Sequence, residues 1–278
     1  MAKAPKSVHA IKHDDATRKN IPTAEMESFF LREEDSAPRP PVGEATAILF
    51  AEEGARVIVA DRDEAGGVQT VETIRAAGGE ASFVHVDVAE EESVAAMVRR
   101  TVEIFGRVDC AVNNAGITPD TAMVADADLT VFDRIIAVNL RSVLASMKYE
   151  IRQFLEQGSG GAIVNISSTT GVRPQPTNSA YVASKHGVIG LTKTASVEYA
   201  AQGIRVNCVL PGAIDTPLIQ TAFAKLDIDP ADYAPVLSLF NRLGTPREVA
   251  QGSLWLCSDL SSYVTGHSLA VDAGYTSR

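Results

Sequence analysis

The residues with the clearest chemical potential are a tyrosine and a lysine four positions apart. Tyr181 and Lys185 occur in the stretch AYVASKHG, and in a helix this spacing places both side chains on one face. A free tyrosine hydroxyl titrates near ~10, and an ammonium group beside it favours the phenolate. The pair therefore predicts proton exchange by Tyr181 near neutral pH. Taken alone, such a pair is more often an ordinary contact on a helix surface.

Two further polar residues could complete this site. Ser168 ends the apolar stretch GAIVNISS, where the carboxyl end of a strand can point a hydroxyl toward a substrate oxygen. Serine is also common at strand ends simply because the chain turns there. Asn139 lies within a helical pattern although an amide is a mediocre helix former. A water molecule held by its side chain would explain that position.

Three other features follow apolar stretches that are predicted strands. NNAG, Asn113–Gly116, ends in a glycine that permits a flat ligand to approach the backbone closely. Asp61 follows RVIVA and could bind ribose hydroxyls while repelling a 2′-phosphate, and Asp87 follows SFVHV and could accept a hydrogen bond from an adenine amino group. Each feature alone is more often an ordinary strand end or turn.

The elements that must position these residues alternate regularly from Gly43 onward. Apolar strands without strict alternation, separated by amphipathic helices, predict a single Rossmann-type α/β domain with a doubly wound parallel sheet covered on both faces. The expected strands lie near residues 56–60, 81–86, 108–112, 161–168, 203–210 and 268–274, and the expected helices near 43–54, 63–79, 91–106, 128–157, 179–201 and 245–258.

Two segments interrupt this pattern. Residues 215–245 contain two short helical patterns limited by prolines, and we interpret them as a substrate lid, although a plain surface connection fits the composition equally well. Residues 1–42 have few apolar residues and scattered charges, which is typical of a poorly packed, disordered or foreign arm. The expected domain therefore spans residues 43–278, and its first strand is expected to be atypical or absent.

Composition excludes several classes of function. The net charge of −10 opposes binding to a nucleic-acid backbone, despite five basic residues in the first twenty. No stretch is apolar enough to span a membrane and the start lacks a signal-peptide pattern, so a cytoplasmic protein is expected. Cys110, Cys208 and Cys257 lie far apart among apolar neighbours, which favours buried thiols over disulfides or a metal site.

Several of these motifs together resemble one family. Asp61, Asp87, NNAG, Asn139, Ser168, Tyr181, Lys185 and PGAIDT occur in the order and spacing of the short-chain dehydrogenases/reductases, and the resemblance covers about 236 residues, from Gly43 to Arg278. It implies hydride transfer between a nicotinamide cofactor and an alcohol or ketone, in a protein that is commonly a dimer or tetramer. The stretches MKYEI, PGAIDTPL and VDAGYTS look most like bacterial members that act on cyclic alcohols or diols.

The resemblance also implies the role of each residue. Tyr181 would exchange the proton, and Lys185 would lower the tyrosine pKa and bind the nicotinamide ribose. Ser168 would polarise the substrate oxygen and Asn139 would hold a relay water. Asp61 suggests NAD as the cofactor rather than NADP, although the basic residue Arg62 follows it directly. The implied cofactor-binding residues are Gly43, Asp61, Arg62, Asp87, Val88, Asn114, Ala115, Gly116, Tyr181, Lys185, Pro211, Gly212, Ile214 and Thr216.

The start of the chain departs from the family pattern. Members open with a strand and Thr-Gly-x-x-x-Gly-x-Gly, but here only Gly43 matches a glycine, and Pro41 stands at the second glycine position. Prolines lack the amide hydrogens that bind a pyrophosphate, so phosphate binding should suffer. FLREED, residues 30–35, would place charges in a central strand, although SFFL, residues 28–31, could form a strand stub.

Two explanations for this start remain open. The chain is a degenerate family member that binds dinucleotide weakly, or residues 1 to about 42 are a foreign or wrongly joined piece, which we favour. The function is therefore expected to be an NAD-dependent alcohol dehydrogenase or ketone reductase. The alternative is a cofactor-deficient, non-catalytic homologue that acts through oligomerisation, with the helices near residues 127–157 and 179–201 as the natural interface.

Overall fold

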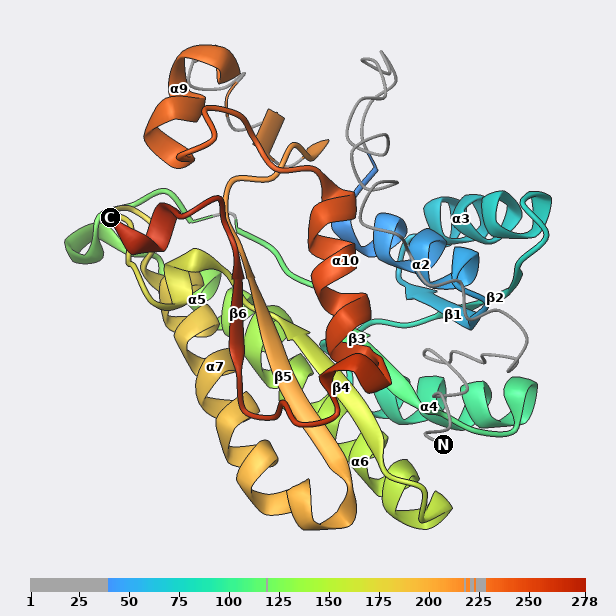
Figure 1. The fold of residues 1–278 in the computed structure, drawn as a ribbon. Coiled ribbons are helices and arrows are strands. Elements are labelled where there is room, and N and C mark those ends of the chain that lie inside the picture. Colours follow the sequence, from blue (N-terminus) through green and yellow to red (C-terminus); the bar gives the residue numbers. More distant parts are fainter. Residues whose placement is uncertain (1–39, 119, 218, 221–222, 224–228) are drawn as a thin grey trace.

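A computed structural model describes residues 40–118, 120–217, 219–220, 223 and 229–278 of the chain. Within this part, helices and strands alternate as the sequence predicts (Figure 1). The expectations for residues 1–39, and for most of LIQTAFAKL in the predicted lid, lie outside the described residues. The strands are β1 (Arg56–Asp61), β2 (Glu80–His85), β3 (Cys110–Asn113), β4 (Gly161–Ile166), β5 (Ile204–Pro211) and β6 (Ser268–Val271).

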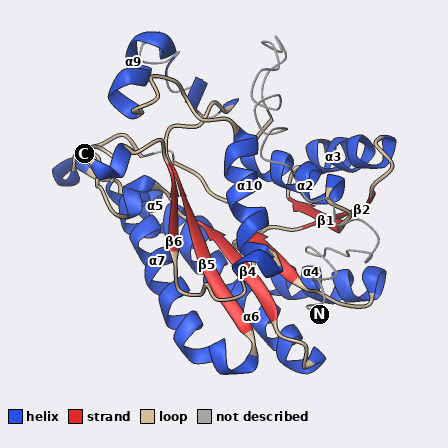
Figure 2. Cartoon of the chain, viewed as in Figure 1, coloured by secondary structure: helices blue, strands red, loops and turns tan. Residues whose placement is uncertain are grey.

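All the strand pairs are parallel, but they form two groups. β3, β4, β5 and β6 are neighbours in that order, and β1 pairs with β2 (Figure 2). Among the described residues, no strand pairs with both β1 and β3, so the sheet is divided where its strand order reverses. This confirms the prediction of a doubly wound parallel sheet, while the prediction for its first strand concerns residues outside the described part of the chain.

Helices cover both faces of the strands, which explains why the strands are mostly apolar. One apolar core joins the strands to α2, α3 and α10, and a second joins them to α4, α6 and α7. Figure 1 shows α10 in front of the strands, with α6 and α7 behind them. These helices are α2 (Val42–Glu52), α3 (Glu64–Ala76), α4 (Glu91–Phe105), α6 (Ser142–Gln157), α7 (Ser179–Tyr199) and α10 (Pro246–Cys257).

Glycines end two of these helices at the expected places. The backbone of Gly106 after α4 and of Gly158 after α6 is left-handed, with φ of 83° and 65°. A side chain is strained in that conformation, so glycine is favoured there. The three cysteines are buried and free, as predicted.

The sequence pattern is less accurate for two segments. The helix expected over residues 128–157 is α5 (Leu129–Ile136) and α6, joined by a π-helical turn at Ala137–Arg141. In the predicted lid, the structure describes one further helix, α9 (Pro230–Leu237), which contains Pro235. No helix within the described residues is long and apolar enough to cross a membrane.

Candidate active site

Tyr181 and Lys185 both lie on α7, near the carboxyl ends of the parallel strands. The Lys185 side chain is buried, and its Nζ donates a hydrogen bond to the carbonyl oxygen of Ile166, the last residue of β4, at 2.8 Å. Nζ also lies 5.5 Å from the centre of the Tyr181 ring. The predicted pair is therefore held together at the end of the central strand.

Ser168 and Gly116 lie at the same place. The Ser168 side chain forms a hydrogen bond with the Tyr181 hydroxyl, and its Oγ accepts one from the backbone N–H of Thr170 at 3.2 Å. A Cβ on Gly116 would stand 3.5 Å from the Lys185 Nζ. The loop after β3 thus passes close to the lysine, and four residues singled out from the sequence meet in one cluster.

Asn139 joins this cluster from the π-helical turn, and its full burial accounts for an amide inside a helix. Its Oδ1 accepts a hydrogen bond from Ile117 N, and its Nδ2 donates one to Ile117 O, both at 2.8 Å. Nδ2 also contacts the Ser184 hydroxyl at 3.3 Å. The side chain therefore fastens the loop after NNAG to the helix. π-Helical turns occur frequently at functional sites.

The expected effect of the lysine on the tyrosine pKa is not observed. Burial raises the pKa of Tyr181, the hydrogen bond from Ser168 opposes that rise, and the charge of Asp120 adds to it. Burial lowers the pKa of Lys185 to about 8. The reason is that loss of water disfavours the charged form of both groups. In this structure the Tyr181 pKa is therefore raised, and the contribution of the Lys185 charge to proton transfer stays a prediction.

Asp120 is a site residue that the sequence reading missed. Its Oδ2 accepts hydrogen bonds from the backbone N–H groups of Ala180 at 3.0 Å and Tyr181 at 3.3 Å, so it caps the first turn of α7. Its Oδ1 is buried and has no hydrogen-bond partner among the described residues. The sequence pattern could not identify Asp120 as a helix cap, because this residue lies about 60 positions before the helix that it caps.

We expect replacement of Asp120 by alanine to destabilise the protein. Loss of a side-chain helix cap costs roughly 0.5–2 kcal/mol, and two backbone donors of α7 would lose their acceptor. Asp120→Asn should lose less because its amide oxygen can still accept. Urea unfolding followed by circular dichroism measures the change, with Asp133→Ala on the exposed side of α5 as the matched control. An Asp120→Ala variant as stable as that control would refute the capping role.

The predicted adenosine-side residues line a different part of the same edge. Gly43, Asp61, Val88, Asn114 and Ala115 all border a cavity of about 270 Å³ between β1 and β3. A Cβ on Gly43 would approach the Asn114 Nδ2 to 2.9 Å, so the start of α2 lies close to the loop after β3. This cavity lies where the strand order reverses, the usual ligand site of an open α/β sheet.

Two predicted residues next to this cavity are engaged elsewhere or exposed. Asp87 binds its own loop, because its Oδ1 accepts from Ala89 N at 2.9 Å and its N–H donates to the Ser93 hydroxyl at 3.1 Å. Arg62 is exposed directly after Asp61. In sequence, both residues adjoin residues that line the cavity, but neither lines it.

The residues present fit the two ends of a dinucleotide better than its pyrophosphate. α2 begins after Pro41 and has no side-chain cap, so its first amides point to the crevice with fewer donors than a glycine-rich loop provides. Glu44, in the first turn of α2, lines the same cavity, and burial raises its pKa. A carboxylate there opposes a bound pyrophosphate whenever it is ionised.

The predicted nicotinamide-side residues lie after β5. Pro211 is the last residue of β5, and the Gly212 N–H donates to Val271 O at 3.0 Å. Thr216 Oγ1 accepts a hydrogen bond from Ile219 N at 3.4 Å. Ile214 lines a second cavity, of about 280 Å³, rather than the one between β1 and β3.

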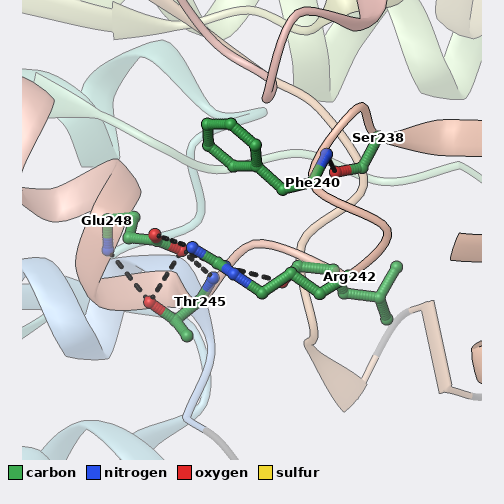
Figure 3. Close-up of polar contacts among 6 residues, drawn as sticks. Ser238, Phe240, Arg242, Thr245 and Glu248 are labelled. Atoms are coloured by element: carbon green, nitrogen blue, oxygen red, sulfur yellow. Dashed lines mark hydrogen bonds and ion pairs between the residues drawn. The ribbon is translucent and has the colours of Figure 1, made fainter. Parts of the chain in front are cut away.

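On one side, the second cavity is bordered by residues at the start of α10 that hydrogen bonds and an ion pair hold in place. Thr245 and Glu248 form a capping box there, and Arg242 forms an ion pair with Glu248 at 2.7 Å (Figure 3). Phe240 also borders this cavity, and its backbone N–H donates to the Ser238 hydroxyl at 3.1 Å. These contacts fix the segment that connects α9 to α10.

Comparisons with known proteins agree with this architecture. A family model described as enoyl-(acyl carrier protein) reductase matches residues 39–276. The short chain dehydrogenase/reductase astE of Aspergillus oryzae is 45% identical over 234 residues, which cover 84% of this chain and 90% of the relative. A cyclohexanol dehydrogenase of an Acinetobacter species is 42% identical, with 85% of this chain and 91% of the relative covered.

A solved structure gives the same result for the fold. ElxO with NADP bound superposes with a TM-score of 0.80 at 32% identity, and the match covers 87% of this chain and 97% of that chain. The chain belongs to the short-chain dehydrogenase/reductase family. The resemblance inferred from the motifs is therefore confirmed.

Proposed function

We propose that this protein is an oxidoreductase that transfers a hydride between NAD(H) and a secondary alcohol or ketone, with a cyclic alcohol or diol as the substrate class. The observation that carries the proposal is the cluster of Tyr181, Ser168 and Lys185 at the carboxyl end of β4. The likeness to a cyclohexanol dehydrogenase supports the substrate class.

Each side chain of the cluster has a separate role in the transfer of the hydride and the proton. The nicotinamide supplies or accepts the hydride when bound. Ser168 binds the substrate oxygen and Tyr181 holds the proton that moves to or from that oxygen. Lys185, anchored on Ile166 O beside the tyrosine ring, supplies the positive charge that favours the phenolate during the transfer.

Asp61 supports NAD over NADP. It ends β1, borders the crevice and accepts a hydrogen bond from Asp63 N at 2.9 Å through Oδ1. A carboxylate at this position binds ribose hydroxyls and repels a 2′-phosphate. Lys185 and Tyr181 would hold the nicotinamide ribose, with Gly116 leaving space beside them.

A second candidate function is suggested by the start of α2 and by exposed apolar side chains on α6 and α7. Pro41 and Glu44 weaken the pyrophosphate site, which favours a cofactor-deficient homologue that acts through association. Leu144 and Leu155 on α6 and Val197 on α7 are exposed, by 52%, 45% and 84%. Both helices therefore offer apolar side chains to a second copy, and a homodimer or homotetramer is part of the proposal.

The two candidates differ in cofactor binding and turnover. We expect the full chain to bind NADH more tightly than NADPH in a fluorescence titration, and to produce NADH from NAD⁺ and cyclohexanol. Replacement of Asp61 by alanine should remove the preference between the cofactors, while replacement of the exposed Asp133 should not. Failure to bind NADH at millimolar concentration would reject the dehydrogenase and leave the non-catalytic homologue.

A further inference from the structure

The residues after β6 form a turn with a defined conformation, the C-terminal turn (Asp272–Arg278). The Asp272 carboxylate fixes it, because Oδ1 accepts a hydrogen bond from Gly274 N at 2.9 Å and Oδ2 accepts one from Thr276 N at 2.8 Å. Gly274 has a φ of 76°, in the left-handed region that favours glycine. These contacts hold Tyr275, which is half-buried, in one place.

The Tyr275 ring contacts the loop that carries Ser168. The Arg173 guanidinium lies over the ring, 4.5 Å from its centre, and the Arg173 Nη1 donates a hydrogen bond to the Tyr275 carbonyl oxygen at 2.6 Å. The backbone N–H of Arg173 donates to the carbonyl oxygen of Thr169, the residue after Ser168, at 2.8 Å. The C-terminal turn is therefore tied to the helical turn that begins beside Ser168.

The same ring contacts α9 through Arg278. The Arg278 guanidinium lies 5.7 Å from the centre of the Tyr275 ring, and it donates hydrogen bonds to the carbonyl oxygens of Pro235, at 3.3 Å, and of Val236. These carbonyls belong to the last turn of α9, where a positive charge complements the helix dipole. A residue that the Tyr275 ring contacts therefore holds the end of α9.

The chain after α9 also contacts the C-terminal turn directly. The N–H of Leu239, two residues beyond α9, donates to the carbonyl oxygen of Ala273 at 3.0 Å. A Cβ on Gly274 would stand 2.6 Å from the Leu239 side chain, so the two segments pack closely. Figure 1 shows α9 beyond the carboxyl end of β5. The C-terminal turn thus joins α9 to the Ser168 loop at the edge of the candidate active site.

The aromatic ring, and not its hydroxyl, makes this connection. Neither Arg173 nor Arg278 forms an ion pair within the part of the chain that the structure describes. A cation over an aromatic ring is attracted to the negative face of the ring. The Tyr275 hydroxyl contributes little, because its contact with the Gln175 Nε2 is long, at 3.5 Å.

We propose that Tyr275 is a positioning residue for the alcohol substrate: its ring, in contact with both Arg173 and Arg278, fixes α9 relative to the loop that carries Ser168. The inference rests on the proposed function, in which Ser168 binds the substrate oxygen. With α9 fixed, the substrate meets a wall that is already formed, and less binding energy is used to order that helix. Tyr275 therefore acts on the affinity for the alcohol, and not on the proton transfer that Tyr181 carries out.

Hydrogen exchange of the full chain, read by mass spectrometry, tests the contact without requiring enzyme activity. Tyr275→Ala should speed exchange of residues 232–240 by ~5–30-fold, the effect expected when two cation–π contacts are lost. Tyr275→Phe keeps the ring and should exchange like the parent chain, and Tyr263→Ala, at a fully exposed tyrosine, is the matched control. Parental exchange of residues 232–240 in Tyr275→Ala would overturn the proposal. Equal acceleration in β4 would also overturn it, because that result means a loss of overall stability.

Steady-state kinetics with NAD⁺ and cyclohexanol test the role in substrate binding. Tyr275→Ala should raise KM for cyclohexanol by the same ~5–30-fold, while kcat changes less than about twofold and NADH affinity stays the same. Tyr275→Phe should keep the parental KM. A lower kcat at unchanged KM would overturn the proposal, since Tyr275 would then only stabilise the fold. A parent chain without turnover would refute the proposed function, and with it the role in substrate binding, while hydrogen exchange would still show whether Tyr275 holds α9.

Discussion

Replacement of Tyr181 by phenylalanine lowers kcat/KM for cyclohexanol oxidation by ~10²–10⁴-fold, the usual contribution of a positioned acid or base. The change removes only the hydroxyl, so the ring keeps its place 5.5 Å from the Lys185 Nζ. Ser168 loses its hydrogen-bond partner but keeps the contact from Thr170 N. Because the lost group exchanges the proton, kcat should fall far more than NADH affinity, since Lys185 still holds the nicotinamide ribose.

Tyr199→Phe is the matched control because it removes a hydroxyl from the other end of the same helix. Steady-state rates of both variants, with circular dichroism to verify folding, separate a chemical from a structural effect. A Tyr181→Phe variant with more than a tenth of the parent kcat/KM would exclude Tyr181 as the proton-exchanging group. The result would leave the fold and the family unchanged.

The fold could be predicted from the sequence because its signals are local. Apolar runs such as RVIVA and glycines such as Gly106 and Gly158 specify strands and helix ends within a few residues. The π-helical turn at Ala137–Arg141 was not predictable, since the contact that its Asn139 makes is with a residue 22 positions away. Periodicity does not record such contacts.

The residues that form the site could be predicted from the sequence, but the direction in which the Tyr181 pKa shifts could not. Tyr181, Ser168 and Lys185 follow from motif order, and the structure brings them together. The direction of the Tyr181 pKa depends on burial, which a one-dimensional pattern does not measure, and here burial raises it despite the hydrogen bond from Ser168. Asp120 and Glu150 were missed because their significance depends on neighbours that are distant in sequence.

Glu150 is a buried acid in the core between α6 and the strands. It is fully buried, its Oε2 accepts a hydrogen bond from Asn113 Nδ2 at 3.2 Å, and its Oε1 has no partner among the described residues. Asn113 also donates to Asn165 Oδ1 at 2.9 Å, so the amide is shared between two acceptors. Burial raises the pKa of Glu150 from 4.5 to about 7, with the Asn113 hydrogen bond opposing the rise.

This shift makes stability depend on pH in a definite direction. Between pH 4.5 and about 7 the folded protein holds a proton that the unfolded chain releases, so the stability is present at low pH and is lost as pH rises through the folded pKa. The loss is on the order of 3 kcal/mol above pH 7, since one pKa unit corresponds to about 1.4 kcal/mol.

Glu150→Gln should therefore stabilise the protein at pH 8.5 but have little effect near pH 5. Glutamine keeps the shape and still accepts from Asn113, but it has no charge to desolvate. A gain of that size raises Tm by roughly 6–12 °C at pH 8.5. Thermal unfolding at both pH values measures it, with Glu156→Gln on the exposed side of α6 as the control. An equal change in Tm at the two pH values would show that Glu150 is ionised in the folded protein, and that burial of this carboxylate is compensated by contacts other than Asn113.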